Sequence, residues 1–228
     1  MTDYDKIAET FSAKVDALPG NQHYERPATI ALLPPLKGLD VLDAGCGSGF
    51  YVDHCHRAGA RVVGFDPSVE MVKEARKRIG KRCMLIHCSS AELHDRLGDK
   101  TFDLILSNLV MHYVEDMTAE LRLLVPELKP GGRILLSMKH PLMNGAFIQE
   151  HGFRASGPVE LDWEFAGGTV THIQRPLGAI TESIYEAGLL IERLVEALPE
   201  EEMATKSPAG YRLAMRKPFF IHFILRPR

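Results

Sequence analysis

Residues 41–51 read Val-Leu-Asp-Ala-Gly-Cys-Gly-Ser-Gly-Phe-Tyr, and this stretch decides the fold of the chain. A short apolar run ends at Asp43, as expected for a strand buried on both faces of a parallel sheet. Three glycines follow at alternate positions, namely Gly45, Gly47 and Gly49. Glycines at this spacing allow a sharp turn and bring bare backbone against a ligand. The segment 50–58 can then form a helix whose N-terminal amides face that ligand.

Downstream of this stretch, apolar runs alternate with helical periods, which predicts a parallel sheet covered by helices on both faces. We expect strands at 39–44, 61–66, 83–88, 102–107 and 133–138. We expect helices near 49–58, 68–79, 90–97 and 117–127. The segment Lys129-Pro130-Gly131-Gly132 is interpreted as a turn that ends the last of these helices and starts the fifth strand. A helix near 176–187 and strands at 189–196 and 219–226 complete the chain.

Two segments fall outside this alternation. Residues 4–18 and 27–33 have helical periods that end at proline, so we expect a helical lid over residues 1–35. The notable polar side chains of this lid are Tyr4, Tyr24 and Arg26. Residues 140–172 are rich in Gly, Pro, Phe and Trp, lack a clear period, and end in a β-like Gly-Thr-Val-Thr-His-Ile. We interpret them as an insertion whose large aromatic side chains are buried: Phe147, Phe153, Trp163 and Phe165.

The composition is that of a soluble globular protein of one domain. The 228 residues are 45% hydrophobic and 25% charged, and the formal net charge is -3. This charge disfavours a nucleic-acid partner, and the basic residues between Lys73 and Arg82 are interpreted as the solvated face of a helix. No apolar run approaches the ~20 residues of a membrane span, and the N-terminus lacks a signal peptide's pattern. We therefore predict a cytoplasmic protein with no membrane contact.

The cysteines give no sign of disulfides or of a metal. Cys46, Cys55, Cys83 and Cys88 form no Cys-x-x-Cys pair, which suits a reduced compartment. The tripeptide His54-Cys55-His56 could attract a metal, but neighbouring side chains on a helix point about 100° apart and cannot all face one ion. We predict no metal site.

A carboxylate follows the second predicted strand. Asp66 ends the run Val-Val-Gly-Phe-Asp-Pro-Ser at residues 62–68. At this place a carboxylate can accept hydrogen bonds from both hydroxyls of a ribose. The alternative is that Asp66 or Ser68 only caps the next helix.

Two more motifs follow the third and fourth strands. Residues 88–93 read Cys-Ser-Ser-Ala-Glu-Leu, directly after the third strand. Residues 102–113 read Phe-Asp-Leu-Ile-Leu-Ser-Asn-Leu-Val-Met-His-Tyr, and Asn108 and His112 lie at the carboxyl end of the fourth strand. Open α/β sheets bind ligands at this end of their strands.

Together these motifs resemble those of the class I S-adenosylmethionine-dependent methyltransferases, and most closely the small-molecule subgroup called type 11. The resemblance covers residues 36–138. The dinucleotide fingerprint G-x-G-x-x-G differs, because Phe50 stands where its third glycine would lie, and the Gly-Lys-Ser/Thr of a phosphate loop is absent. The resemblance implies S-adenosylmethionine as cofactor, S-adenosylhomocysteine as product, and a small-molecule acceptor methylated on oxygen or nitrogen.

The resemblance also implies a fold. It is an α/β, Rossmann-like, doubly wound sheet of seven strands in the order 3-2-1-4-5-7-6, with an antiparallel last strand between the fifth and the sixth. The chain would be a single methyltransferase domain over residues 1–228. Its expected parts are the lid (1–35), the cofactor-binding core (36–139), a substrate-side insertion after the fifth strand (140–175), and a C-terminal helix and β-hairpin (176–228) that complete the sheet.

By the same resemblance, most cofactor contacts come from the motifs. The expected contacts are Asp43, Gly45, Cys46, Gly47, Gly49, Asp66, Pro67, Ser68, Ser90, Ala91, Glu92 and Asn108, with Tyr24 and Arg26 from the lid. Ser90 replaces the aspartate that in the family meets the adenine amino group, and a neutral hydroxyl makes a weaker contact. Cys46 is expected to be a small packing residue beside the cofactor.

Two histidines are candidate catalytic bases. His112 and His140 each follow a strand end near the expected position of the methyl group, and histidine titrates in the right range. A base is needed only if the acceptor must lose a proton, so His112 could instead pack the pocket floor. Two other functions stay open: a nicotinamide-dependent oxidoreductase, and a non-catalytic S-adenosylmethionine-binding protein that acts through a partner. No sequence signal specifies an oligomeric state.

Overall fold

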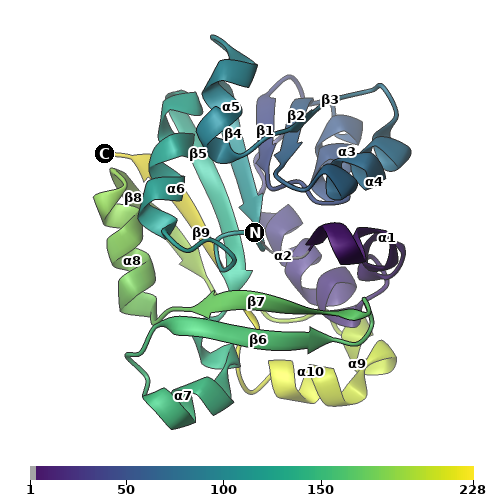
Figure 1. Ribbon diagram of the computed structural model, residues 1–228, viewed down its shortest axis with the longest axis vertical. Helices are drawn as coiled ribbons and strands as arrows, with labels where there is room; N and C mark the ends of the chain where they lie inside the picture. The colour runs from purple at the N-terminus through teal and green to yellow at the C-terminus, as the bar shows by residue number, and fades with distance from the viewer. Residues whose placement is uncertain (1–3) are drawn as a thin grey trace.

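The computed structural model describes residues 4–228, so the first three residues of the predicted lid lie outside the described part (Figure 1). At the centre of this part is a seven-stranded sheet in the order β3-β2-β1-β4-β5-β9-β8. These strands are β1 (Asp40–Ala44), β2 (Arg61–Asp66), β3 (Met84–His87), β4 (Phe102–Asn108), β5 (Leu128–Lys139), β8 (Leu189–Val195) and β9 (Phe220–Pro227). Strands β1 to β5 pair in parallel, whereas β9 is antiparallel to β5 and β8. The predicted sheet order and its antiparallel last strand are confirmed.

Helices cover both faces of this sheet (Figure 1). Helices α5 (Ser90–Leu97), α6 (Met117–Leu124) and α8 (Leu177–Glu186) pack on one face. Helices α2 (Arg26–Leu32), α3 (Phe50–Arg57) and α4 (Val69–Ile79) pack on the other. Helix α4 shows the sequence reason, because its buried residues Met71, Ala75 and Ile79 recur at a spacing of four and Ser68 caps its N-terminus.

The parallel register brings several strand ends to one edge of the sheet. Asp43 of β1 lies opposite Gly64 of β2, and Asn108 of β4 lies opposite Ser137 of β5. Because these strands run in the same direction, the residues that follow them gather at the carboxyl edge, where open α/β sheets bind ligands.

Strand β5 is longer than its apolar pattern indicates, and the predicted turn at residues 129–132 is wrong. The strand begins at Leu128, which lies opposite Phe102, and the register shifts between Phe102 and Leu104. Gly131 has φ +81°, a conformation that favours glycine. Proline and glycine therefore mark an irregular part of a strand here and not a break between elements.

The predicted insertion after β5 contains regular structure. It comprises a 3₁₀ turn (Pro141–Met143), helix α7 (Gly145–His151) and a hairpin of β6 (Gly157–Trp163) and β7 (Gly168–Gln174). The expectation that its aromatic side chains are all buried is wrong for Phe153, which is 53% exposed in the turn after α7. Trp163 and Phe165 are partly buried against residues of the N-terminal helix.

Some short elements have no counterpart in the sequence prediction. Helices α9 (Glu202–Lys206) and α10 (Pro208–Ala214) lie between β8 and β9, and a π-helix (Asn21–Glu25) precedes α2. A 3₁₀ turn (Val125–Glu127), which the predicted helix near 117–127 included, joins α6 to β5. Each is at most seven residues long, too short for a helical period to be recognised.

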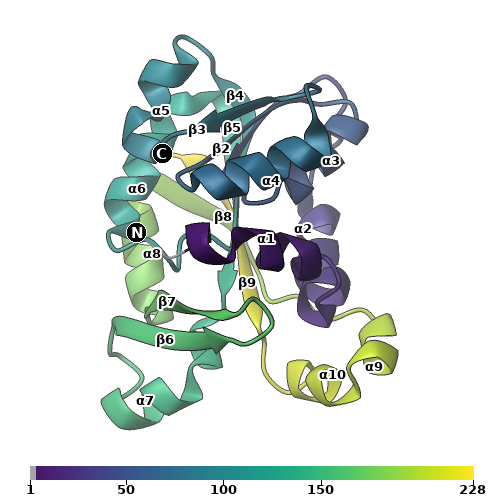
Figure 2. The ribbon, with the colours of Figure 1, turned by 45° about the vertical axis from the view of Figure 1, so that its right-hand side comes forward.

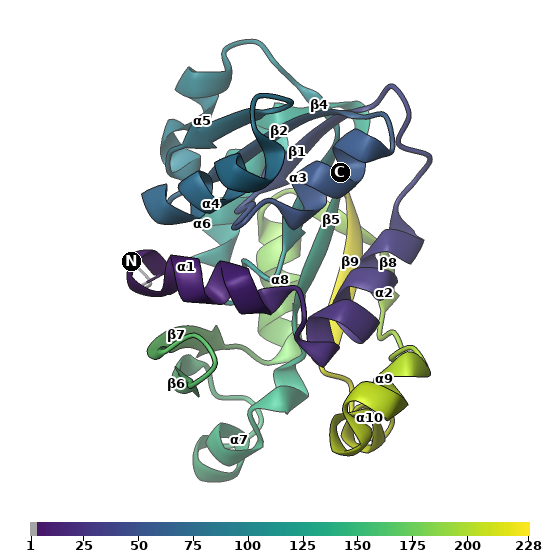
Figure 3. The same ribbon diagram turned by 90° about the vertical axis from the view of Figure 1, so that its right-hand side faces the viewer.

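The N-terminal helix α1 (Tyr4–Val15) lies in the segment that we predict to be a lid, and we refer to it by that name. It lies between α4 of the core and the β6–β7 hairpin, and Figures 2 and 3 show it crossing the space between them. Asp5 accepts a hydrogen bond from the Ser68 hydroxyl at the start of α4. At the far end of the helix, Asp16 pairs with Arg78 of α4 at 2.6 Å. The lid is thus attached to the core at both of its ends.

Candidate active site

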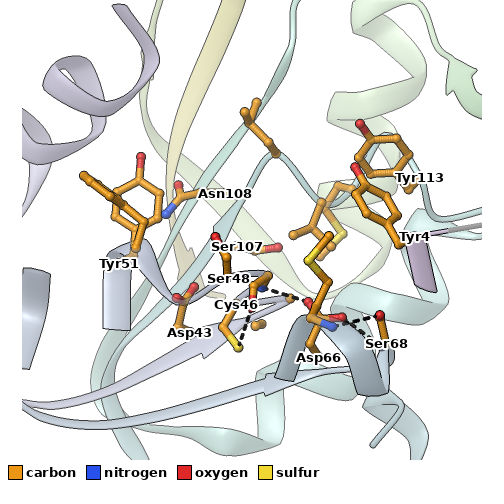
Figure 4. Close-up of a pocket in the computed structure, with 18 of the residues that line it drawn as sticks. Tyr4, Asp43, Cys46, Ser48, Tyr51, Asp66, Ser68, Ser107, Asn108 and Tyr113 are labelled. Atoms are coloured by element: carbon orange, nitrogen blue, oxygen red, sulfur yellow. Dashed lines mark hydrogen bonds between the residues drawn. The ribbon is translucent and has the colours of Figure 1, made fainter. Parts of the chain in front are cut away.

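A cavity of about 600 Å³ lies at the carboxyl edge of the sheet, under the lid. This volume is within the range of small-molecule sites, roughly 300–1,000 Å³. Figure 4 shows two sides of it: Asp43, Ser107 and Asn108 lie at the strand ends, whereas Tyr4 and Tyr113 lie together on the other side. We call these the cofactor side and the acceptor side.

The three glycines after β1 are required for different reasons. A side chain at Gly45 would meet Val110 at 2.5 Å, and one at Gly49 would meet Ile79 at 2.7 Å, so both positions are closed by packing. Gly47 has φ +50°, and a Cβ added there would have no heavy atom within 4 Å. Gly47 therefore presents bare backbone to open cavity space, as a ligand-binding loop requires.

Asp66 connects this loop to the end of β2. One carboxylate oxygen accepts the Gly47 N–H at 2.8 Å and the other accepts the Ser68 N–H at 2.9 Å. Burial raises the pKa of Asp66, and the two N–H donors oppose that rise. Each carboxylate oxygen keeps a lone pair for one further hydrogen bond.

Several buried polar atoms on the cofactor side have no hydrogen-bond partner among residues 4–228. They are Asp43 Oδ2, Ser107 Oγ, and both Asn108 Oδ1 and Nδ2. Burial, followed by repulsion from Asp66 and Glu25, raises the pKa of Asp43 to about 7. Unpaired polar atoms in a cavity are costly without a ligand, so this group fits a polar, cationic part of a bound molecule.

Glu25 is a functional candidate that the sequence analysis missed. Its carboxylate is buried in the cavity wall and accepts hydrogen bonds from Thr29, Tyr51 and Ser137. The three donors belong to three different elements, so no short sequence motif predicts that Glu25 lines the cavity. The neighbouring Arg26 lines the cavity as expected, with its guanidinium 3.7 Å from the centre of the Phe50 ring.

A second missed carboxylate faces the motif after β3. The Ser90 hydroxyl donates to Glu120 of α6, and both residues line the cavity. Burial raises the pKa of Glu120, and the Ser90 hydroxyl opposes that rise. The acid that is absent from the motif is thus present a short distance away, on a different helix.

The acceptor side is mainly aromatic. Tyr4 and Phe11 of α1 contact Trp163 of the hairpin, and the Phe11 and Trp163 rings stack at 5.5 Å between centroids. Tyr113, from the segment after β4, packs edge-on against Tyr4 at 5.4 Å. Lys139, the last residue of β5, lines the same side.

The backbone is strained where the two sides of the cavity meet. Leu109 directly follows β4 and has φ +56°, the one positive φ among the non-glycine residues described. Its N–H donates to the Ser137 carbonyl at 2.8 Å, which holds the turn in place. Strain of this kind gathers at ligand sites.

Comparisons with known proteins agree with this geometry. Residues 42–136 match the family model Methyltransf_11, described as a methyltransferase domain. A solved S-adenosylmethionine-dependent methyltransferase of Mesorhizobium loti is 27% identical, with a TM-score of 0.70 over 90% of this chain and 99% of that one. Residues 42–136 are therefore similar to a methyltransferase domain, and the chain as a whole resembles a solved S-adenosylmethionine-dependent methyltransferase.

Curated relatives match only in part. An uncharacterized protein of Haemophilus influenzae is 33% identical over 129 residues, which are 54% of this chain and 50% of that protein. The human mitochondrial ubiquinone biosynthesis O-methyltransferase is 33% identical over 109 residues, 45% of this chain and 29% of that enzyme. The matched part of this chain therefore spans half or less of the length of these two relatives.

The cavity lining brings together most of the residues that the sequence analysis predicted for the methyltransferase site. They are Arg26, Asp43, Gly45, Cys46, Gly47, Asp66, Pro67, Ser68, Ser90, Asn108 and His112. The rest of the predicted set lies outside the lining: Tyr24, Gly49, Ala91, Glu92 and His140.

Two of the outlying residues have clear structural roles. The Tyr24 hydroxyl accepts the Phe219 N–H at 3.2 Å and its ring is buried against Phe219 and Phe220. The Glu92 carboxylate accepts hydrogen bonds from Ser89, which closes a capping box at the start of α5.

The two candidate bases have different surroundings. His112 lies in the cavity wall, its ring is buried, and neither ring nitrogen has a partner among residues 4–228. Burial lowers the pKa of His112 well below the usual range, and the positive charge of Lys139 lowers it further. His140 points elsewhere: its Nε2 lies 2.7 Å from Glu196 and its Nδ1 accepts the Leu142 N–H.

No helix among residues 4–228 has the length and apolar character needed to cross a membrane. Within the same residues, no group of three or more His, Cys, Asp or Glu side chains is arranged to hold a metal ion.

Proposed function

We propose that this protein transfers a methyl group from S-adenosylmethionine to an oxygen or nitrogen of a small-molecule acceptor. The observation that carries the proposal is the continuity of the cavity. One space runs from the Gly47–Asp66 unit to the aromatic side chains under the lid, so it can hold cofactor and acceptor together.

The cofactor side offers partners for each polar part of S-adenosylmethionine. Asp66 would hold the ribose hydroxyls, and Glu120 with Ser90 would meet the adenine amino group. The unpaired oxygen of Asp43 would receive the ammonium group of the methionine part, and Arg26 would face its carboxylate. These assignments give Asp43 Oδ2 a partner and leave the polar atoms of Ser107 and Asn108 for further contacts with the bound molecule.

The chain's contribution to the transfer is alignment and exclusion of water. Bound S-adenosylmethionine supplies a methyl group on a positively charged sulfur; the new bond to the acceptor forms as the carbon–sulfur bond breaks, with its electrons going to sulfur. The lid and the hairpin enclose the acceptor side with aromatic rings and hold the acceptor in place. Alignment of this kind is worth several kcal/mol, so no single side chain has to be indispensable.

His112 would act as a neutral hydrogen-bond acceptor for a hydroxyl or amine of the substrate. Its ring nitrogens lie free in the cavity wall, and its lowered pKa keeps the imidazole uncharged. His140 has no comparable access, because both of its ring nitrogens are engaged outside the cavity lining. Several curated relatives are named ubiquinone biosynthesis O-methyltransferases, which supports oxygen as the acceptor atom.

The test is direct. S-adenosylhomocysteine should raise the melting temperature of the protein and NADH should not, and protein given methyl-labelled S-adenosylmethionine should label a component of a pooled small-molecule library. Stabilisation by NADH alone would favour an oxidoreductase and overturn the proposal. Tight binding of S-adenosylhomocysteine with no labelled product from any pool would instead support a non-catalytic binding protein.

A further inference from the structure

Lys139 is a cation with no counter-ion in the acceptor side of the cavity. It ends β5, is half-buried, and its ammonium lies 5.7 Å from the centre of the Trp163 ring. Within residues 4–228 its ammonium makes no hydrogen bond or ion pair. The other cation of the lining, Arg26, is paired with Asp16 at 2.7 Å.

The carboxylates of the cavity are not available to Lys139. Four of them have partners on the cofactor side or at the lid: Asp5 with Ser68, Glu25 with three hydroxyls, Asp66 with two backbone N–H groups, and Glu120 with Ser90. Asp43, the fifth, is placed at the end of β1 beside the glycine loop. Among the described residues, Lys139 therefore forms no ion pair with a carboxylate of the lining.

The groups around Lys139 do not compensate its charge. The residues that face it are His112 after β4, His172 of β7, and the Trp163 ring of the hairpin. Burial, followed by the charge of Lys139, lowers the pKa of His172 to about 4. Burial lowers the pKa of Lys139 itself to about 8, so the side chain is still mostly charged near pH 7.

The acceptor side is lined by aromatic rings. Its walls are the rings of Tyr4, Phe11, Tyr113, Trp163 and Phe165, contributed by the lid, the segment after β4 and the hairpin. Aromatic rings gain most from a planar aromatic partner that can stack on a face or approach an edge. Rings alone would also attract a cation, but Lys139 already occupies that role and would repel a second positive charge.

We propose that the acceptor of this methyltransferase is a planar aromatic molecule bearing an acidic oxygen group, a carboxylate or a phenolate, which pairs with Lys139. This inference rests on the proposed function, because it assigns the substrate class of the same site. An ion pair with a buried partner would neutralise Lys139, whereas a neutral acceptor would leave the ammonium desolvated and unpaired.

Matched probes can test charge and shape separately. The probes are 2-naphthoate and 2-naphthamide, benzoate and benzamide, and 2-naphthylmethylammonium, titrated by calorimetry into protein saturated with S-adenosylhomocysteine. We expect at least one acid to bind about tenfold or more tightly than its amide, and the cationic probe not to bind. Lys139→Met should remove that preference by weakening the acid about tenfold while the amide changes less than about twofold.

Two further variants distinguish loss of the positive charge from a general disturbance of the structure. Lys139→Arg keeps the charge and should keep the acid preference. Lys81→Met removes an exposed lysine outside the cavity lining and should leave every affinity unchanged. Equal binding of acids and amides, failure of both acids to bind, or an acid preference that survives Lys139→Met would each overturn the inference.

The affinity for S-adenosylhomocysteine, measured on the same samples, separates the two proposals. If the parent protein does not bind S-adenosylhomocysteine, the proposed function fails. If it binds S-adenosylhomocysteine normally but shows no preference for acids, only the assignment of the substrate class fails.

Discussion

The backbone N–H of Gly47 donates to the carboxylate of Asp66 over 2.8 Å, so the glycine loop after β1 and the end of β2 form one unit. The same carboxylate also accepts the N–H of Ser68 at the start of α4. Three consecutive parts of the cofactor side are therefore held by one side chain, and substitutions within this unit should affect the cofactor first.

Gly47→Val should abolish binding of S-adenosylhomocysteine. The new side chain would project into open cavity space, and the positive φ would cost about 1–3 kcal/mol of stability. Gly131→Val is the matched control, because Gly131 also has a positive φ and open surroundings but lies outside the cavity lining. Calorimetry should show loss of binding in the first variant only; equal affinities in both would place the cofactor elsewhere.

Affinity for S-adenosylhomocysteine should depend on pH through Asp43. An acid with a raised pKa becomes charged only as the pH passes that value, which for Asp43 is about 7. The ammonium group of the ligand prefers the charged carboxylate, so affinity should rise about tenfold from about pH 6 to 8. Asp43→Asn should bind more weakly with a flat profile over this interval. A rise of the same size in the variant would exclude Asp43 as its source.

Glu120 should decide whether the adenine amino group is recognised. The parent protein should bind S-adenosylhomocysteine about tenfold more tightly than S-inosylhomocysteine, which has an oxygen in place of that amino group. Glu120→Gln should reduce this preference, since the amide is no longer a charged acceptor. Glu182→Gln, on the exposed part of α8, is the control. If Glu120→Gln keeps the same preference, Ser90 or the backbone recognises the adenine amino group and Glu120 does not.

His112→Ala should lower turnover about tenfold and leave cofactor affinity within about twofold. The reason is that the variant loses a neutral hydrogen-bond acceptor in the cavity wall. Because the pKa of His112 is lowered, the pH profile of turnover in the parent should show no inflection from this imidazole near its ordinary pKa. His140→Ala should lower the melting temperature, because it removes the contact with Glu196, without a comparable loss of turnover. Equal turnover in His112→Ala and the parent would leave His112 a packing residue.

Trp163→Ala should weaken an acceptor-side ligand such as 2-naphthoate about tenfold, because it removes the ring that stacks on Phe11 and faces Lys139. Affinity for S-adenosylhomocysteine should be nearly unchanged. Phe153→Ala removes an aromatic ring of the same insertion that is 53% exposed and lies outside the cavity lining. If both variants behave alike in the titration, the hairpin does not form the acceptor site.

The sequence predicts much of the cavity lining at the strand ends, because the features that place these residues are local. The turn after β1 requires bare backbone, and the sequence has glycines there. The carboxylate at the end of β2 is visible in the sequence as Asp66. The sheet order follows from the resemblance and from the alternation of strands and helices. These features depend on residues that are close in sequence.

The parts that the sequence does not predict depend on contacts between distant residues. Glu25 is defined by hydroxyls that approach from α2, α3 and β5, and Glu120 by a serine 30 positions earlier. Tyr24 has the residue type of a binding group, but Phe219 and Phe220, where β9 begins, bury its side chain. Likewise, no period in the sequence reveals that Trp163 meets Phe11.

Helix α1 touches both of the proposed reactant positions, through Asp5 on Ser68 beside Asp66 and through Phe11 on Trp163 near Lys139. Binding of either ligand would therefore contribute to the free energy that holds α1 against the core and the hairpin. Filling either position stabilises the docked helix and prepares the other, which would give positive cooperativity between them without any direct contact.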